Sequence, residues 1–174
     1  MTFQEEKVIL VDIHDNPVGE MEKMEAHRLA LLHRAFSVFI FNEKKELMLQ
    51  QRAAGKYHSP LLWTNTCCSH PRTGETTEGA AHRRLKEEMG FDCELNEIFS
   101  FIYKEALDQG LTEHEFDHVF VGAFNGVPEI NPTEVETWKW MKMEDIASDL
   151  AKNPGNYTVW FRIAFERVRG YLVN

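Results

Sequence analysis

The sequence of 174 residues has few of the features that mark specialised classes of protein. It has three cysteines, which cannot all pair, and two of them, Cys67 and Cys68, are adjacent; this indicates a reduced, cytoplasmic protein. No apolar run reaches transmembrane length, and the start, MTFQEEKVILVD, lacks the basic segment and apolar core of a signal peptide. We also find no internal repeat and no low-complexity segment.

Positive charge is scarce as well. The 19 lysines and arginines stand against 28 acidic residues, and the net charge of -9 argues against nucleic acid or a membrane as a partner. An anionic substrate would therefore need a local cationic pocket or metal ions. Hydrophobic residues make up 43% and charged residues 27%, which is typical of a soluble globular protein. By length, we expect residues 1–174 to form one domain.

Residue patterns predict several strands, with helices near the middle and at the end. We expect strands over 8–13, 18–21, 34–41, 46–51, 98–105, 116–124 and 137–143. Helices are expected after Thr76 or Thr77, over 144–151 and over 157–172, while 22–32 is either a helix or an irregular turn. Residues 52–62 read as a loop. This order favours an α/β or α+β sandwich.

The most informative stretch is 63–90, WTNTCCSHPRTGETTEGAAHRRLKEEMG, which combines a thiol, an imidazole, an arginine and paired carboxylates. Its spacing resembles the Nudix box, G-x5-E-x7-R-E-U-x-E-E-x-G-U, a pattern of hydrolases whose helix carboxylates bind divalent metal. The matching residues are Glu75, Arg83, Leu85, Glu87, Glu88, Gly90 and Phe91. Ser69 replaces the first glycine, and Arg84 replaces a glutamate. Arg84 would weaken a metal cluster and offer an anion a partner, so the fold can persist without the hydrolysis.

Two further groups of polar residues are candidates for chemistry. Imidazoles and carboxylates suit zinc, manganese or magnesium, and the candidate ligands are His27, His33, His70, Glu113 and Glu115. In an extended chain Glu113 and Glu115 face the same side. The ordinary interpretation of His27 and His33 is one exposed and one capping histidine. The second group, Lys23, Arg52, Lys56 and Arg84, would form a phosphate pocket if its members converge.

Cys68 is the candidate reactive thiol. It lies in a polar segment two residues from His70, which favours reactivity. In an extended segment Cys67 points the other way and is expected to be structural.

Several segments are similar to type 1 isopentenyl-diphosphate isomerases, in the order of that family and over nearly the whole chain. They are EKMEAH, LHRAFSVFIFN, QQRAAGK, WTNTCCSHP, RRLKEEMG, TEHEFDHVF and YTVWF. TNTCCSHP is far more specific than the Nudix box. The resemblance implies a Nudix-like sandwich of mixed sheets flanked by helices. It also implies isomerisation of isopentenyl and dimethylallyl diphosphate, in isoprenoid biosynthesis, by protonation and deprotonation of carbon.

The same resemblance implies roles for individual residues. One divalent metal (Mn, Zn or Mg) would be held by His27, His33, His70, Glu113 and Glu115. Magnesium on the substrate diphosphate would be held by Glu88 and the main-chain carbonyl of Cys68, and the diphosphate oxygens by Lys23, Arg52, Lys56 and Arg84. Cys68 and Glu115 would flank the hydrocarbon, with their order as proton donors left open. Tyr103 would assist Glu115, and Trp160 would cover the carbocation. No flavin is expected, and the protein would be a monomer or weak homodimer.

Two other functions are compatible with the residues. One is a Nudix hydrolase of a nucleoside diphosphate derivative, although Arg84 interrupts the acidic helix that this chemistry needs. The other is a non-catalytic module that binds metal or diphosphate. Such a module would tolerate the substitution Cys68→Ala.

Overall fold

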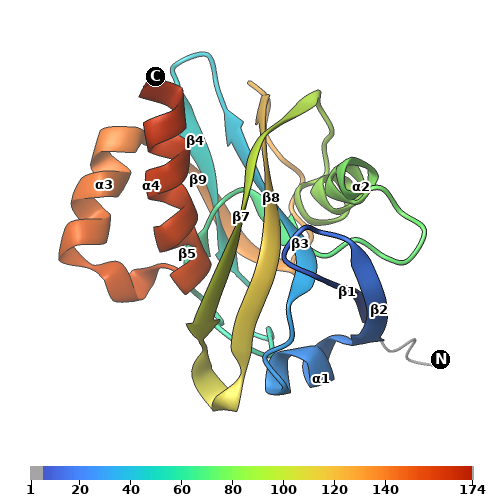
Figure 1. The fold of residues 1–174 in the computed structure, drawn as a ribbon. Coiled ribbons are helices and arrows are strands. Elements are labelled where there is room, and N and C mark those ends of the chain that lie inside the picture. Colours follow the sequence, from blue (N-terminus) through green and yellow to red (C-terminus); the bar gives the residue numbers. More distant parts are fainter. Residues whose placement is uncertain (1–5, 174) are drawn as a thin grey trace.

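The computed structural model describes residues 6–173 (Figure 1). Its strands are β1 (Lys7–Val11), β2 (Pro17–Glu22), β3 (His33–Phe41), β4 (Glu46–Arg52), β5 (Trp63–Thr64), β6 (Cys67–Ser69), β7 (Leu95–Ala106), β8 (Thr112–Ala123) and β9 (Val135–Lys142). The α-helices are α1 (Lys23–Arg28), α2 (Thr77–Met89), α3 (Met143–Lys152) and α4 (Val159–Val173). Two short 3-10 turns, η1 (Asp108–Gly110) and η2 (Pro154–Asn156), complete the list. None of the helices in this range is long and apolar enough to cross a membrane.

Helices cover a mixed sheet on both faces, as Figure 1 shows: α3 and α4 on one side and α2 on the other. The strand β3 supplies both cores because its side chains alternate. Phe36, Val38 and Ile40 pack with α2, whereas Phe39 packs with Phe161 and the rest of α4. This arrangement confirms the predicted Nudix-like sandwich.

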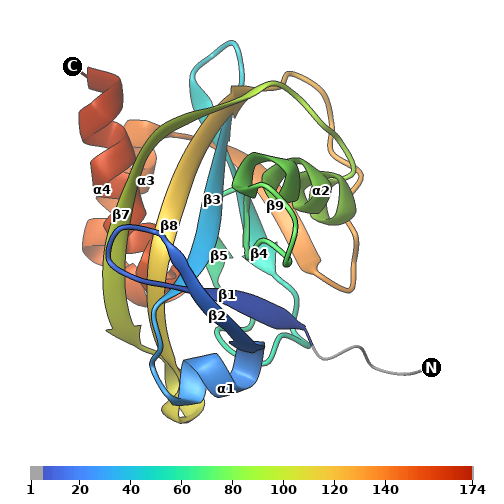
Figure 2. The ribbon, with the colours of Figure 1, turned by 45° about the vertical axis from the view of Figure 1, so that its right-hand side comes forward.

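The position of β3 among the other strands explains how distant segments meet. It pairs in parallel with β8, which places His33 opposite Glu115, and antiparallel with β6, which places Ser37 opposite Cys68. On the far side of β8, β7 places Tyr103 opposite Glu115. The strands β7, β8 and β3, seen side by side in Figure 2, together with β6 thus bring these residues together.

The helix α2 begins at one of the two caps that the sequence predicts. The Thr76 side chain accepts a hydrogen bond from the Gly79 amide at 3.0 Å, which satisfies one free donor of the first turn. The helix ends at Gly90, where φ is +71° and an added Cβ would lie 2.3 Å from the Glu129 carbonyl oxygen. A side chain at that position would therefore be excluded by both backbone conformation and space. The apolar face of α2, formed by Ala80, Ala81, Leu85 and Met89, is buried.

Most element boundaries differ from the sequence prediction by one to three residues, and the end of α1 and the start of β8 differ by four. The helix α1 ends at Arg28, because Ala30 takes a left-handed conformation (φ 54°) and turns the chain into β3. The strand β8 begins at Thr112 rather than at residue 116. Its first residues alternate between half-buried and buried, but the buried ones, Glu113 and Glu115, are acidic. A search for apolar alternation misses them for that reason.

Candidate active site

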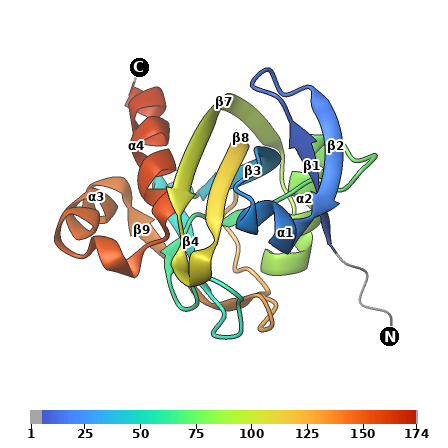
Figure 3. The same ribbon diagram turned by 60° about the horizontal axis from the view of Figure 1, so that its bottom comes forward.

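A cavity lies where α1, the loop after β4, β6, β8 and the start of α4 approach one another. Figure 3 shows α1 beside the turn that joins β7 and β8. The predicted site residues that line the cavity are Lys23, Arg52, Lys56, Cys68, His70, Arg84, Glu88, Glu113, Glu115 and Trp160. His27, His33 and Tyr103 lie behind its wall with exposed fractions of 0%, 0% and 7%. The structure therefore gathers every predicted residue, and the ordinary interpretation of His27 and His33 is wrong, because both are fully buried.

His27, His33, His70 and Glu113 form a compact group of potential metal ligands. One ligand atom from each lies within 4.8 Å of the others. His70 Nε2 is also 2.8 Å from Glu115 Oε2, so that the second carboxylate borders the group.

The hydrogen bonds of two of these histidines orient them as ligands. His27 Nδ1 lies 2.6 Å from the Lys23 carbonyl oxygen, and His33 Nδ1 lies 2.9 Å from the Leu31 carbonyl oxygen. A carbonyl only accepts, so in a neutral ring each Nδ1 carries the proton and each Nε2 presents a lone pair. Metal-binding histidines are typically fixed in this manner.

The lone pairs of the His27 and His33 Nε2 atoms face carboxylate oxygens, and a cation between them would remove this repulsion. His27 Nε2 is 3.1 Å from Glu113 Oε1, and His33 Nε2 is 3.5 Å from Glu115 Oε2. His33 Nε2 and Glu113 Oε2 are buried and have no hydrogen-bond partner within residues 6–173. Unpartnered buried polar atoms are costly, and a divalent ion would satisfy both. The residues present therefore fit a metal ion, and the mixed nitrogen and oxygen donors suit Zn²⁺ or Mn²⁺.

Burial and neighbouring groups shift the acidities of this group apart. Burial lowers the pKa of His70 to about 4, against the opposing effect of Glu115. Burial and the charge of Glu115 raise the pKa of Glu113. For Glu115 burial works in the same upward direction, but hydrogen bonding and charge from His33 and His70 hold its pKa well below the usual range. Glu115 is thus favoured over Glu113 as the ionised carboxylate.

Glu115 receives a further hydrogen bond, from the hydroxyl of Tyr103. Burial and the nearby carboxylates raise the pKa of Tyr103 well above its ordinary value, so its hydroxyl stays protonated and donates. The predicted support of Glu115 by Tyr103 is therefore present in the geometry.

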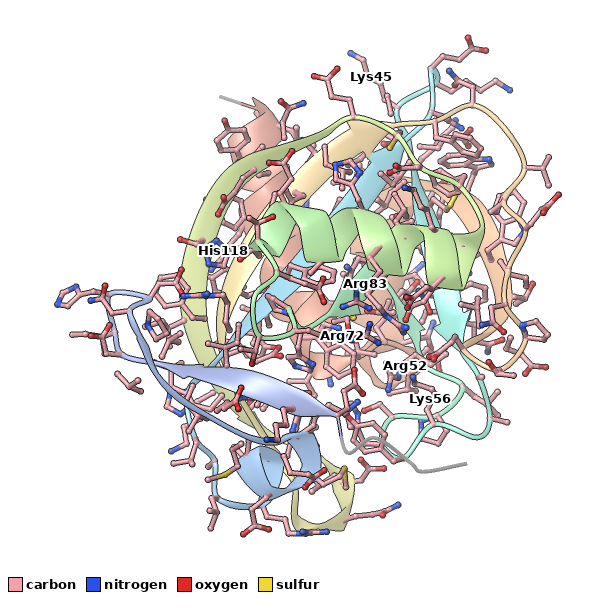
Figure 4. All side chains as sticks on the ribbon, turned by 90° about the vertical axis from the view of Figure 1, so that its right-hand side faces the viewer. Lys45, Arg52, Lys56, Arg72, Arg83 and His118 are labelled. Atoms are coloured by element: carbon pink, nitrogen blue, oxygen red, sulfur yellow. The ribbon has the colours of Figure 1, made fainter. Side chains whose placement is uncertain are left out.

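Cationic side chains converge on the other side of the cavity, and three of them already hold carboxylates. Lys23 Nζ lies 2.6 Å from Glu6 Oε2, and Lys56 Nζ lies 2.6 Å from Glu134 Oε2. Arg84 contacts Glu88 at 2.7 Å and Glu87 at 2.6 Å. Figure 4 shows Arg52 and Lys56 close together at the edge of the loop after β4. These ion pairs place the cations where they can bind an anionic ligand, but the ligand must displace the carboxylates.

Arg52 differs from the other three because it forms no ion pair within the described residues. Its Nη2 donates to the His58 carbonyl oxygen at 3.1 Å, and its guanidinium lies 5.2 Å from the centre of the Trp160 ring. The charge of Arg52 is thus available to a ligand in the cavity.

Cys68 faces the same cavity as Glu115. Burial, rather than any charge, is the main cause that raises the pKa of its thiol, so it holds its proton. Cys67 is fully buried and packs with Ala80 and Leu85 against α2, on the opposite face. The two cysteines thus face opposite sides of β6, as expected for an extended segment, and the reactive role of Cys68 stays a prediction.

Six residues of the cavity wall were not assigned to the site from the sequence: Glu6, Phe36, Tyr57, His58, Ser69 and Glu134. His58 lies in a loop that reads as solvated, yet it is only 3% exposed. The acidic residues reach the site through ion pairs with distant cations, which leave no local pattern in the sequence.

Comparisons with known proteins agree with this geometry. The model of the NUDIX domain family matches residues 31–161. The chain is 54% identical over 164 residues to isopentenyl-diphosphate Delta-isomerase 2 of Aromatoleum aromaticum, covering 94% of this chain and 87% of that protein. It is 50% identical over 165 residues to isopentenyl-diphosphate Delta-isomerase of Pectobacterium atrosepticum, covering 95% and 92%.

Solved structures show the same fold at lower identity. The protein DR0079 of Deinococcus radiodurans aligns with a TM-score of 0.72 at 22% identity, covering 85% of this chain and 90% of that one. An Ap4A hydrolase of C. elegans aligns with a TM-score of 0.56 at 20% identity, covering 80% and 97%. Taken with the matching relatives and the assembled site residues, these similarities show that the chain belongs to the isopentenyl-diphosphate Delta-isomerase family, built on a NUDIX domain.

Proposed function

We propose that this chain interconverts isopentenyl and dimethylallyl diphosphate. The observation that carries the proposal is that a protonated thiol, Cys68, and a carboxylate, Glu115, line one cavity whose far side is cationic. The reaction adds a proton to the terminal carbon of the double bond, which leaves a tertiary cation. A proton then leaves the carbon on the other side of that cation, and its electron pair forms the new double bond.

The diphosphate end of the substrate would be bound by Lys23, Arg52, Lys56 and Arg84. Arg52 can bind first, because it forms no ion pair within residues 6–173, and the carboxylates of Glu6 and Glu134 then give way. Glu88 is oriented by Gln50 Nε2, which donates to its Oε2 at 3.1 Å. Together with the Cys68 carbonyl, Glu88 would hold magnesium that arrives with the diphosphate.

The hydrocarbon end would lie between Cys68 and Glu115. Burial keeps the Cys68 thiol protonated, so it is suited to give a proton, whereas the hydrogen bonds to Glu115 favour a carboxylate that accepts one. Microscopic reversibility exchanges these roles in the reverse direction. Tyr103 holds the Glu115 carboxyl in place from the side away from the cavity.

Trp160 would protect the cationic intermediate. Its side chain is 5% exposed and forms part of the cavity wall. An indole face stabilises a cation by about 0.5–2 kcal/mol, and more when water is excluded. A closed wall also prevents water from trapping the cation.

The histidines and Glu113, with Glu115 at their edge, would hold one divalent ion, Mn²⁺, Zn²⁺ or Mg²⁺. When bound, such an ion supplies positive charge that lowers the proton affinity of the neighbouring carboxyl groups. The protein's own contribution is to orient the Nε2 atoms of His27 and His33 through their bonds to main-chain carbonyls. We place the protein in the cytoplasm, because its three cysteines are free thiols and a reducing compartment keeps them so.

The test is to incubate the protein with isopentenyl diphosphate and Mg²⁺ in D₂O and to follow the double bond and deuterium uptake by NMR. We expect dimethylallyl diphosphate labelled at carbon. Release of phosphate without isomerised product would identify a hydrolase instead. Cys68→Ala should abolish turnover while the metal content stays that of the parent, and Cys67→Ala should retain turnover. Full activity of Cys68→Ala would remove the thiol from the mechanism.

A further inference from the structure

His58 lies at the junction of the metal group and the hydrocarbon wall, in the loop between β4 and β5. Its side chain is 4% exposed, and its carbonyl oxygen accepts the bond from Arg52. Its ring lies 6.0 Å from that of His27 and 4.4 Å from that of Tyr57, measured between centroids. A histidine so enclosed among site residues has a role that its loop position does not reveal.

The hydrogen-bonding environment of His58 differs from that of the ligand histidines. The Nδ1 atoms of His27 and His33 face carbonyl oxygens, whereas His58 Nδ1 lies 3.2 Å from Ser59 Oγ. A hydroxyl can donate, and when it does the ring proton sits on Nε2. His58 Nε2 then presents a proton rather than a lone pair.

That proton points toward a metal ligand. His58 Nε2 is 3.5 Å from Glu113 Oε1, close to but slightly beyond hydrogen-bond length. Glu113 Oε2, the other oxygen, is the one without a hydrogen-bond partner in the described structure. Contact with His58 would hold Oε1 and leave Oε2 directed at the metal position.

The His58 ring also packs against Trp160, which forms part of the cavity wall. It stands at 90° to the Trp160 ring with centroids 5.6 Å apart, a perpendicular arrangement that aromatic pairs favour. Arg52 lies over the same indole. Any movement of His58 would therefore reach both the carboxylate and the indole.

We propose that His58 is a positioning residue that holds Glu113 toward the metal through its Nε2 proton and fixes Trp160 through its ring. The inference rests on the metal centre of the proposed function. It separates two contributions of one side chain, the donor and the ring, and these can be removed independently.

Two variants make the separation. His58→Phe keeps a ring against Trp160 but has no donor, and His58→Gln keeps a donor at the end of the side chain but has no ring. His82→Phe serves as the control, because His82 lies on α2 and pairs with Asp92 outside the cavity. Mn²⁺ binding is measured from the EPR signal of the free ion; Mn²⁺ is chosen because thiolates bind it weakly. Isomerisation is measured at saturating Mn²⁺ and Mg²⁺.

For His58→Phe we expect the Kd for Mn²⁺ to rise about tenfold or more, the range found when a group that orients a metal ligand is lost. Its kcat at saturating metal should stay within about threefold of the parent. His58→Gln should show the opposite pattern, with a nearly unchanged Kd and a kcat lowered several-fold. Parent-like Kd in His58→Phe, or equal losses of Kd and kcat in both variants, would overturn the proposal. If the parent binds Mn²⁺ but does not isomerise, the proposed function fails while the Kd comparison still decides the role of His58.

Discussion

The hydroxyl of Tyr103 offers a direct test of the role of Glu115. The two residues are 7% and 8% exposed and face each other across β7 and β8, so water cannot replace the hydroxyl. A hydrogen bond to a charged group contributes about 1.5–3 kcal/mol. At about 1.36 kcal/mol per tenfold, Tyr103→Phe should lower kcat about 10- to 150-fold if the bond acts in the transition state. KM should change little, because the Tyr103 hydroxyl bonds to Glu115 and not to the cations proposed to bind diphosphate.

The chain provides a matched control in Tyr157. This tyrosine is also buried, and its hydroxyl donates to Asp149 Oδ2 at 2.6 Å, between α3 and the segment before α4. Tyr157→Phe removes the same atom from the same kind of contact, so both variants should lose stability in thermal unfolding. Only Tyr103→Phe should lose kcat. Parent-like kcat in Tyr103→Phe, or an equal loss in both variants, would refute the assignment.

Three other predictions concern charge and metal. Glu134→Gln should lower the Kd for pyrophosphate about fivefold, since the ion pair with Lys56, of about 1 kcal/mol, no longer competes with the ligand. The exposed Glu136→Gln is the control and should leave the Kd unchanged. Calorimetry at low salt measures both values, and a weaker affinity of Glu134→Gln would contradict the prediction. Although burial opposes it, Lys23 lowers the pKa of Glu6 from 4.5 to about 2, so the stability that this pair contributes is present above pH 4.5 and lost as pH falls toward 2. The melting temperature of Glu6→Gln should therefore fall below that of the parent at pH 7, and the difference should vanish near pH 2; a constant difference would exclude this linkage. Chelation should lower the stability of the parent by about 2.7 kcal/mol relative to protein at 100 times its Kd for metal, and His70→Ala should show no such dependence in the same melts.

The fold was predictable where local chemistry agrees with the final structure. Thr76 and Gly90 begin and end α2 as common helix caps. The strand β3 is recognised from its run of apolar residues, which are buried on both faces. The start of β8 was missed because its inward residues are acidic, so the chemistry of the site conceals the strand that carries it.

The site was predictable only in part for a related reason. Cys68 and Arg84 lie in the motif at residues 63–90, and the other site residues were predicted from the similarity to the isomerase family. His58 and Glu134 carry no such signal, since the importance of each depends on which distant side chains it meets. The burial of His58, and the contacts of the Glu134 carboxylate with both Lys56 and Arg84, arise only from the tertiary structure.

The parallel pairing of β3 with β8 also bears on how the protein matures. His27 and Glu113 are 86 residues apart in the chain, yet their side chains meet. While the ribosome is still making the first half, the early histidines have no acidic companions, and the nascent chain offers no complete coordination sphere. A metal ion would therefore find the complete group of ligands only after β8 has been made and has paired with β3, a long-range step of the kind that is slow in folding.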